Sequence, residues 1–310
     1  LGEVEFCHPE IVRYRALRGI SPGQWHLKST WINGVAVEAS ANVEEAHKVT
    51  KGEGVTIAII DDGVALHHPE FQAPGKIVAP RDVTNGNDDV TPCNNDHHGT
   101  CCAGVACAIG WGLVTGVAPA ARLMPIRLNS ALGSLQEAEA FYWAAKNGAD
   151  VISCSWGPPD GAWFKPDDPQ HTVFSPLPAS TRLAIEYAVT QGRGGKGCLV
   201  LFSAGNGGES ADLDGYVSCE YVLAVAACND HSQRSIYSDF GKAIFCCFPS
   251  SDRKWPGRPD PRLVRPRHHP AHDDRRDRQV LQHRHRARDR PDAVARAGGC
   301  LLYTSDAADE

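Results

Sequence analysis

The sequence has no long hydrophobic run and no leader pattern at its first residues. None of its apolar stretches approaches the roughly 18 residues of a membrane-spanning helix, so we expect no membrane segment within these 310 residues. Residues 1–5 show neither the basic region nor the apolar region of a signal peptide. We therefore interpret the start as internal to a longer precursor.

Charge is distributed unevenly along the chain. From Arg253 onward, 14 Lys and Arg stand against 9 Asp and Glu, whereas the preceding 252 residues contain 17 basic and 28 acidic groups. An acidic body favours cationic peptides or calcium as ligands, and it serves surface solvation equally well. The 12 cysteines give weak support for export, but Cys154, Cys198 and Cys228 lie in apolar runs where small buried thiols are expected.

Apolar runs of strand length alternate with helical stretches over most of the chain. The strand-like runs are continuous and rich in β-branched residues, as in strands buried on both faces, and lie at residues 55–60, 122–128, 151–156, 198–203 and 221–227. Helical patterns lie at residues 41–48, 99–108, 134–147 and 179–191. This alternation predicts an α/β fold with a parallel sheet covered on both faces.

The chain divides into three regions by composition. Residues 1–50 form a mixed lead-in segment, residues 51–252 carry the α/β pattern, and residues 253–310 are rich in Arg and His without any periodicity. One interpretation of the last region is a disordered basic tail that binds nucleic acid or acidic surfaces. The other is a reading frame that slipped near Asp260. We favour the second because the preceding motifs stop partway through a domain.

Three polar motifs follow buried strands or begin the next helix. Asp61 ends an apolar strand and precedes a tight Asp-Gly turn, which gives its carboxylate a rigid position. His98 precedes small residues suited to a helix packed closely on the sheet, and Asn206 lies between glycines, where its amide is a neutral donor for an oxyanion. Each motif alone also fits ordinary turn chemistry. Together, at the carboxyl edge of the predicted sheet, they indicate an active site.

In this order, the three motifs resemble those of the subtilisin superfamily of serine peptidases, peptidase S8. Asp61 lies in a D-[DS]-G motif, His98 in H-G-T-x-x-A-G and Asn206 in A-G-N. The resemblance implies a subtilisin-like three-layer fold with a mainly parallel, twisted sheet. It also implies peptide-bond hydrolysis by an Asp-His-Ser triad with Asn206 as the oxyanion donor. Peptides or proteins would be the substrates, with no catalytic cofactor and no specific nucleic acid, and a secreted or cell-envelope location is favoured.

Longer motifs are similar to those of the kexin and furin branch, and they lie at residues 61–63, 153–158, 192–197, 205–208 and 214–216. This similarity implies that Ser155, Trp156 and Gly157 line the substrate backbone. It also implies that Asp160 and Asp214 bind a basic P1 side chain. Around Asp160 the sequence is one acidic residue short of the branch pattern, and solvated loop aspartates are the alternative.

The resemblance implies structural calcium as well. Asp212 and Asp239 are the expected ligands, with Asp160 as a further candidate that would otherwise bind substrate. The histidines at positions 268, 269 and 272 could suggest a transition-metal site, although no fold signal flanks them.

The nucleophile of the family is missing from the sequence. No Gly-Thr-Ser-x-Ala-x-Pro motif follows Asn206, and Ser305 lacks both the preceding Gly and the following Pro, so we do not assign it. We expect a serine endopeptidase by family whose chain, as written, is inactive or nearly so. One alternative is a catalytically dead, subtilisin-like binding module with a basic tail. Another is a metal-dependent hydrolase built on the histidines.

Overall fold

The computed structural model describes residues 20–21, 23–32, 34–93, 96–111, 114–129 and 134–252. Seven strands of this part form one sheet: β3 (Thr56–Asp61), β4 (Arg81–Asp82), β5 (Arg122–Arg127), β6 (Val151–Cys154), β7 (Leu199–Ser203), β8 (Leu223–Cys228) and β9 (Ile244–Pro249). Their order is β4-β5-β3-β6-β7-β8-β9, and every neighbouring pair is parallel. The predicted parallel sheet is therefore confirmed.

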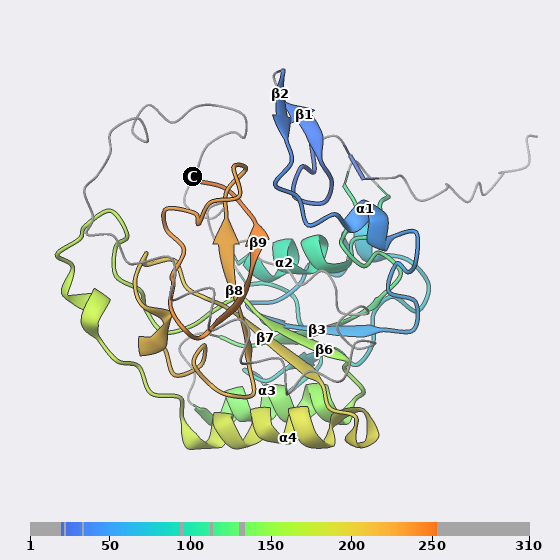
Figure 1. Ribbon diagram of the computed structural model, residues 1–310. Helices are drawn as coiled ribbons and strands as arrows, with labels where there is room; N and C mark the ends of the chain where they lie inside the picture. Colours follow the sequence, from blue (N-terminus) through green and yellow to red (C-terminus); the bar gives the residue numbers. More distant parts are fainter. Residues whose placement is uncertain are drawn as a thin grey trace, which may run out of the picture.

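Helices cover both faces of the sheet (Figure 1). Helix α2 (His98–Cys107) lies on one face, and α3 (Ser134–Lys146) and α4 (Ala179–Gly195) lie side by side on the other. Each face has its own apolar core, the first built around α2 and the second around α3 and α4. The arrangement is the three-layer fold that the sequence predicts.

Strand β3 shows why these runs become central strands. All six of its residues are buried. Ile57 and Ile59 belong to the core under α2, whereas Ala58 and Ile60 belong to the core under α3 and α4. Side chains alternate between the two faces of a strand, so a continuous apolar run fills both cores at once. Each fully buried Ile contributes about 1.5–3 kcal/mol of transfer free energy.

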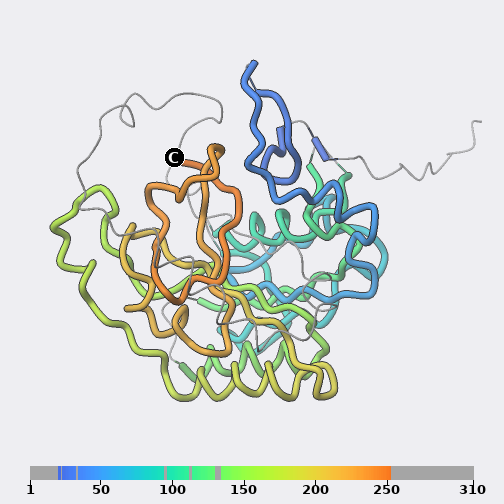
Figure 2. The backbone as a smooth tube through the Cα atoms, viewed as in Figure 1, coloured from blue at the N-terminus to red at the C-terminus, as the bar shows by residue number. Residues whose placement is uncertain are grey.

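Further elements lie around this sheet. Strands β1 (Thr30–Ile32) and β2 (Val35–Val37) form an antiparallel hairpin beside α1 (Val43–Ala46). Short 3-10 helices are η1 (Pro69–Phe71), η2 (Pro169–Thr172) and η3 (Ala211–Leu213). The path between β6 and α4 makes a long excursion that holds η2 and is visible in Figure 2. Among the described residues, no helix is long and apolar enough to cross a membrane.

Candidate active site

Three strands end side by side where the predicted site lies. Strand β3 ends at Asp61, β6 ends just before Ser155, and β7 ends three residues before Asn206. Ile60 pairs with Cys154, which pairs with Phe202. Since neighbouring strands lie about 4.8 Å apart, the ends of β3 and β7 are about 10 Å apart. The carboxyl edge of the sheet therefore carries Asp61, the segment from Ser155 and the turn of Asn206 together.

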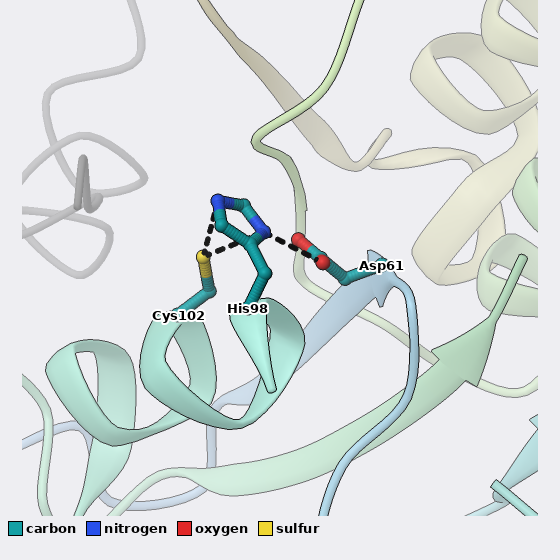
Figure 3. Close-up of side chains that lie close together, drawn as sticks. All are labelled: Asp61, His98 and Cys102. Atoms are coloured by element: carbon teal, nitrogen blue, oxygen red, sulfur yellow. Dashed lines mark hydrogen bonds and ion pairs between the residues drawn. The ribbon is translucent and has the colours of Figure 1, made fainter. Parts of the chain in front are cut away.

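His98 and Asp61 are in direct contact. Nδ1 of His98 lies 2.8 Å from Oδ1 of Asp61 (Figure 3). The residue Asp61 is 5% exposed, and His98 is half-buried. Burial by itself lowers the pKa of His98, but the hydrogen bonds to Asp61 and Cys102 and the charge of Asp61 outweigh it and raise this pKa. Asp61 thus fixes the ring through Nδ1 and leaves Nε2 as the nitrogen that can meet a substrate or nucleophile.

Asp62 fixes the start of the helix that carries His98. Its two carboxylate oxygens accept the backbone N–H groups of His98 at 3.1 Å and Gly99 at 2.7 Å. These N–H groups are among those that a helix leaves unpaired at its first turn. A carboxylate there also interacts favourably with the helix dipole. Because Asp62 follows Asp61 directly, the same turn holds both the carboxylate and the histidine that it orients.

Gly99 is predicted to be intolerant of any side chain. A Cβ at Gly99 would lie 2.3 Å from the carbonyl oxygen of Gly63 and 2.8 Å from Cβ of Asp61, whereas one at Gly104 on the same helix meets nothing within 4 Å. Gly99→Ala should destabilise the fold by about 1–3 kcal/mol. Gly104→Ala, the matched control, should stabilise it by up to about 1 kcal/mol. Urea unfolding measures both, and equal free-energy changes would contradict the close packing.

Trp156 ties the expected substrate-binding segment to strand β3. Its indole N–H donates to the carbonyl oxygen of Ile60 at 2.8 Å, and its ring packs edge-on against Phe202 and Tyr216. A Cβ at Gly157 would lie 3.3 Å from Oδ2 of Asp214. Ser155, Trp156 and Gly157 therefore run between the end of β3 and Asp214.

The turn of Asn206 rests on carboxylates. Its backbone N–H donates to Oδ2 of Asp160 at 2.6 Å, and its side-chain Oδ1 is a buried atom with no hydrogen-bond partner among the described residues. Gly205 has φ +106°, and a Cβ there would lie 2.3 Å from Oδ2 of Asp239. Glycine thus allows these carboxylates to lie directly against the backbone that positions Asn206.

Asp160, Glu209 and Asp239 form a three-carboxylate group. One oxygen from each lies within 4.8 Å of the others. Burial, reinforced by the charge of Asp160, raises the pKa of Asp239 to about 8. His171 is a polar neighbour of the group, with Nδ1 2.5 Å from Oε2 of Glu209. Oxygen donors of this kind suit a calcium ion, which takes about six to eight oxygen ligands in flexible geometry, so these carboxylates would supply part of its coordination.

Asp212 and Asp214, the other two acids predicted for the site, are not members of the three-carboxylate group. Asp212 is exposed and lies outside the three-carboxylate group, and its Oδ1 accepts the N–H of Ala243 at 2.9 Å. Asp214 is half-buried, and its Oδ1 accepts the N–H of Tyr216 at 2.7 Å. Burial, then the charges of Asp160 and Glu209, raise the pKa of Asp214 to about 6. Asp214 therefore lies between the group and the substrate segment.

Two residues of the site were not predicted from the sequence. Glu209 directly follows the glycines after Asn206, and this position next to the Asn206 turn is the feature of the sequence that could have identified it. Cys102 follows His98 by four residues on α2, a spacing that places two side chains on one face of a helix. The whole of the 253–310 region, which includes Ser305 and the histidines that could suggest a transition-metal site, lies outside the described residues.

Comparisons with known proteins show the family of the chain. The sequence profile of peptidase S8, the subtilase family, matches residues 52–260. A calcium-dependent protease of Trichormus variabilis is 61% identical over 249 residues, which is 80% of this chain and 38% of that protein. Furin-like protease 2 of Drosophila melanogaster is 32% identical over 71% of the chain and 13% of its own length.

Solved structures show the same fold. A serine protease of Aeromonas sobria, solved with its chaperone, superposes with a TM-score of 0.61 at 24% identity, over 76% of this chain and 44% of that one. The chain thus spans well under half the length of the curated relatives it matches. On the family profile and the 61% identity, this chain belongs to the subtilase family of serine endopeptidases.

Proposed function

We propose that the described residues are the Asp-, His- and Asn-bearing part of a serine endopeptidase. The observation that carries the proposal is the 2.8 Å hydrogen bond between His98 Nδ1 and buried Asp61 at the carboxyl edge of the sheet. Asp61 orients the ring and balances its charge. His98 accepts the proton of a serine hydroxyl and returns it to the leaving amine. Asn206 donates to the oxyanion, and hydrolysis passes through an acyl-enzyme.

The serine itself is the missing part, because no Gly-Thr-Ser-x-Ala-x-Pro motif follows Asn206 in the 310 residues. The test is labelling by a serine-directed fluorophosphonate, and the 310-residue chain should not react. A version in which a subtilase Ser-bearing segment replaces residues 253–310 should react. A folded extended version that stays unlabelled would leave the alternative, a peptide-binding module without catalysis.

The proposal extends to a kexin-like substrate preference. Furin-type relatives are 30–32% identical over 66–76% of the chain, and Ser155, Trp156 and Gly157 run beside Asp214. Asp214 is the group that would receive an Arg or Lys at P1. Asp160 would instead belong to the three-carboxylate group that binds a cation. Its carboxylate accepts the N–H of Asn206, and it lies with Glu209 and Asp239.

This preference should depend on pH through Asp214. Its pKa is raised to about 6, so in the free enzyme the carboxylate forms only as the pH rises through that value. The ratio of kcat/KM for P1 Arg over P1 Ala should therefore increase about tenfold from about pH 5 to about pH 7. Asp214→Asn should give a flat ratio. A ratio that does not vary with pH in the parent enzyme would remove Asp214 from P1 binding.

We also propose that Asp160, Glu209 and Asp239 hold a structural calcium ion. The named calcium dependence of the Trichormus relative supports this, as does the presence of three carboxylates with one oxygen each within 4.8 Å of the others. The ion would neutralise the repulsion between these carboxylates and keep Asp160 in place under the N–H of Asn206.

Chelation is expected to lower the melting temperature. A ligand at 100 times its Kd adds about 2.7 kcal/mol, which corresponds to about 5–10 °C for a domain of this size. Calorimetry with calcium and with EGTA measures the shift. Asp239→Asn should abolish most of it, whereas Asp212→Asn, an acid outside the group, should retain it. Loss of the shift in Asp212→Asn alone would contradict the assignment.

Two expectations about the whole protein stay predictions. Residues 51–252 would form the peptidase domain. The segment before residue 51 packs against it, because Leu27 and Val43 are buried in the core under α2. Gln24 also donates to the carbonyl oxygen of Thr115 at 2.7 Å. A secreted or cell-envelope location follows from the family resemblance alone.

A further inference from the structure

A buried arginine lies at the carboxyl edge of the sheet, one strand away from Asp61. Arg127 is the last residue of β5 and pairs in register with Asp61, the last residue of β3. Only 5% of Arg127 is exposed. Its Nη1 donates to Oδ2 of Asp82 at 2.9 Å, so an ion pair holds one side of the guanidinium. The proposed mechanism gives this cation no role.

The guanidinium also contacts a cysteine. Nη2 of Arg127 donates to Sγ of Cys93 at 3.2 Å. Cys93 is a free, exposed cysteine in the loop that leads from β4 to α2. Solvent therefore reaches this thiol, while its sulfur rests against a buried cation.

A second donor of the same guanidinium is unfilled. Nε of Arg127 is buried and has no hydrogen-bond partner among the described residues. The N–H of Nε and one N–H of Nη2 are parallel, and together they form the fork with which arginine binds two oxygens at once. The sulfur of Cys93 occupies only the Nη2 half of this fork. A buried polar group without a partner is costly, so a further acceptor atom on Cys93 would be stabilised here.

Oxidation of the thiol supplies such acceptor atoms. A sulfenate carries one oxygen on the sulfur, and a sulfinate carries two. Exposed cysteines beside arginine are among those that react as thiolates. We propose that Cys93 is an oxidation site for hydroperoxides, and that Arg127 binds the oxygens of the oxidised sulfur through Nε and Nη2.

Each oxidation moves one oxygen atom and two electrons. Cys93 first gives its thiol proton to water, and its sulfur then attacks one oxygen of hydrogen peroxide. An S–O bond forms as the O–O bond breaks, and the departing hydroxide takes up a proton to become water. The sulfur is oxidised and the peroxide is reduced, and a second peroxide converts the sulfenate to the sulfinate in the same way. No serine takes part, so this inference does not depend on the proposed protease function.

Two other exposed cysteines provide an internal comparison. Cys246 and Cys247 lie next to each other on β9 and are free and exposed, as Cys93 is. In the part of the chain that the structure describes, an arginine donates to the sulfur of Cys93 and to neither of these two. A difference in reactivity between the two sites therefore reports on the arginine rather than on exposure.

The test is mild hydrogen peroxide treatment of the full 310-residue chain, with dimedone present to trap sulfenic acid and peptide mass spectrometry to separate the sites. Cys93 should be trapped at least about tenfold faster than the peptide that holds Cys246 and Cys247. With more peroxide and no dimedone, Cys93 should be recovered as the sulfinate. Equal trapping rates at the two sites would overturn the proposal.

A variant tests the fork itself. Arg127→Lys keeps a positive charge near Asp82 but removes the two parallel donors. It should slow trapping at Cys93 about fivefold and leave the rate of the Cys246 and Cys247 peptide unchanged, with circular dichroism as the check that the variant is folded. An unchanged rate at Cys93 in the folded variant would overturn the role of Arg127. If the variant does not fold, the comparison within the parent chain decides alone.

Discussion

His98→Ala is expected to lower kcat by about 10⁶-fold in the enzyme extended by a Ser-bearing segment, a magnitude known for subtilisin itself. The imidazole is the group that Asp61 holds at 2.8 Å, and no other described side chain replaces it beside Asp61. Without the base, a serine hydroxyl keeps its proton and is a weak nucleophile. KM should change little, because the imidazole contacts the reacting atoms rather than the length of the peptide.

The adjacent histidine provides the control. His97 is exposed and precedes the first residue of α2, so His97→Ala should retain kcat within a few-fold. Steady-state hydrolysis of a peptide substrate measures both variants. A comparable loss in His97→Ala, or a retained rate in His98→Ala, would contradict the assignment of the base.

Asn206→Ala is expected to lower kcat by about 10²–10³-fold, as does the loss of one oxyanion donor in subtilisin. The side chain follows β7 on a turn held by Asp160, whose Oδ2 accepts the Asn206 N–H at 2.6 Å. A donor that meets charge only in the transition state affects kcat and leaves KM nearly unchanged.

A remote asparagine separates this effect from a general loss of stability. Asn147 is exposed beyond the end of α3, and its side-chain amide donates to the carbonyl oxygen of Trp143 at 2.9 Å. Asn147→Ala should keep the parent kcat and KM. If the loss in Asn206→Ala fell on KM instead of kcat, the amide would bind substrate rather than the oxyanion.

The central strands could be predicted because their sequences carry a strong local signal. The run at 55–60 corresponds to β3 (Thr56–Asp61), since a β-branched segment that fills two cores has few other solutions. The run at 151–156 was predicted too long, because β6 ends at Cys154. Trp156 then leaves the sheet and its indole donates to Ile60, a contact that depends on a residue 96 positions away.

Other elements depend on partners that are distant in the sequence. Strand β9 (Ile244–Pro249) was not predicted, and its residues form a strand because they pair with β8. The hairpin of β1 and β2 has only three residues in each strand, too few for a period to be recognised. Helix α4 was predicted to end at 191, and the following residues 192–194 have non-helical backbone angles, with Arg193 at φ +55° paired to Asp150.

Some residues of the site could be identified from the sequence, and others only from the folded structure. Asp61 and His98 could be identified from their motifs, and the structure brings them into contact. Glu209 and Cys102 required the folded chain, because a carboxylate after a glycine turn and a cysteine in a helix are both ordinary in sequence. Only the geometry places Glu209 with Asp160 and Asp239, and Cys102 beside the imidazole.

The central claim is that Asp61, His98 and Asn206 serve a serine that the sequence in its present reading frame does not carry. Sequencing the encoding DNA from codon 245 onward, and translating its three forward frames, tests this most directly. The account predicts that another frame encodes Gly-Thr-Ser-x-Ala-x-Pro followed by an apolar helix. Confirmation of the Arg- and His-rich frame, with no such motif downstream, would contradict it and make the protein a subtilisin-like fold that binds peptides without cleaving them.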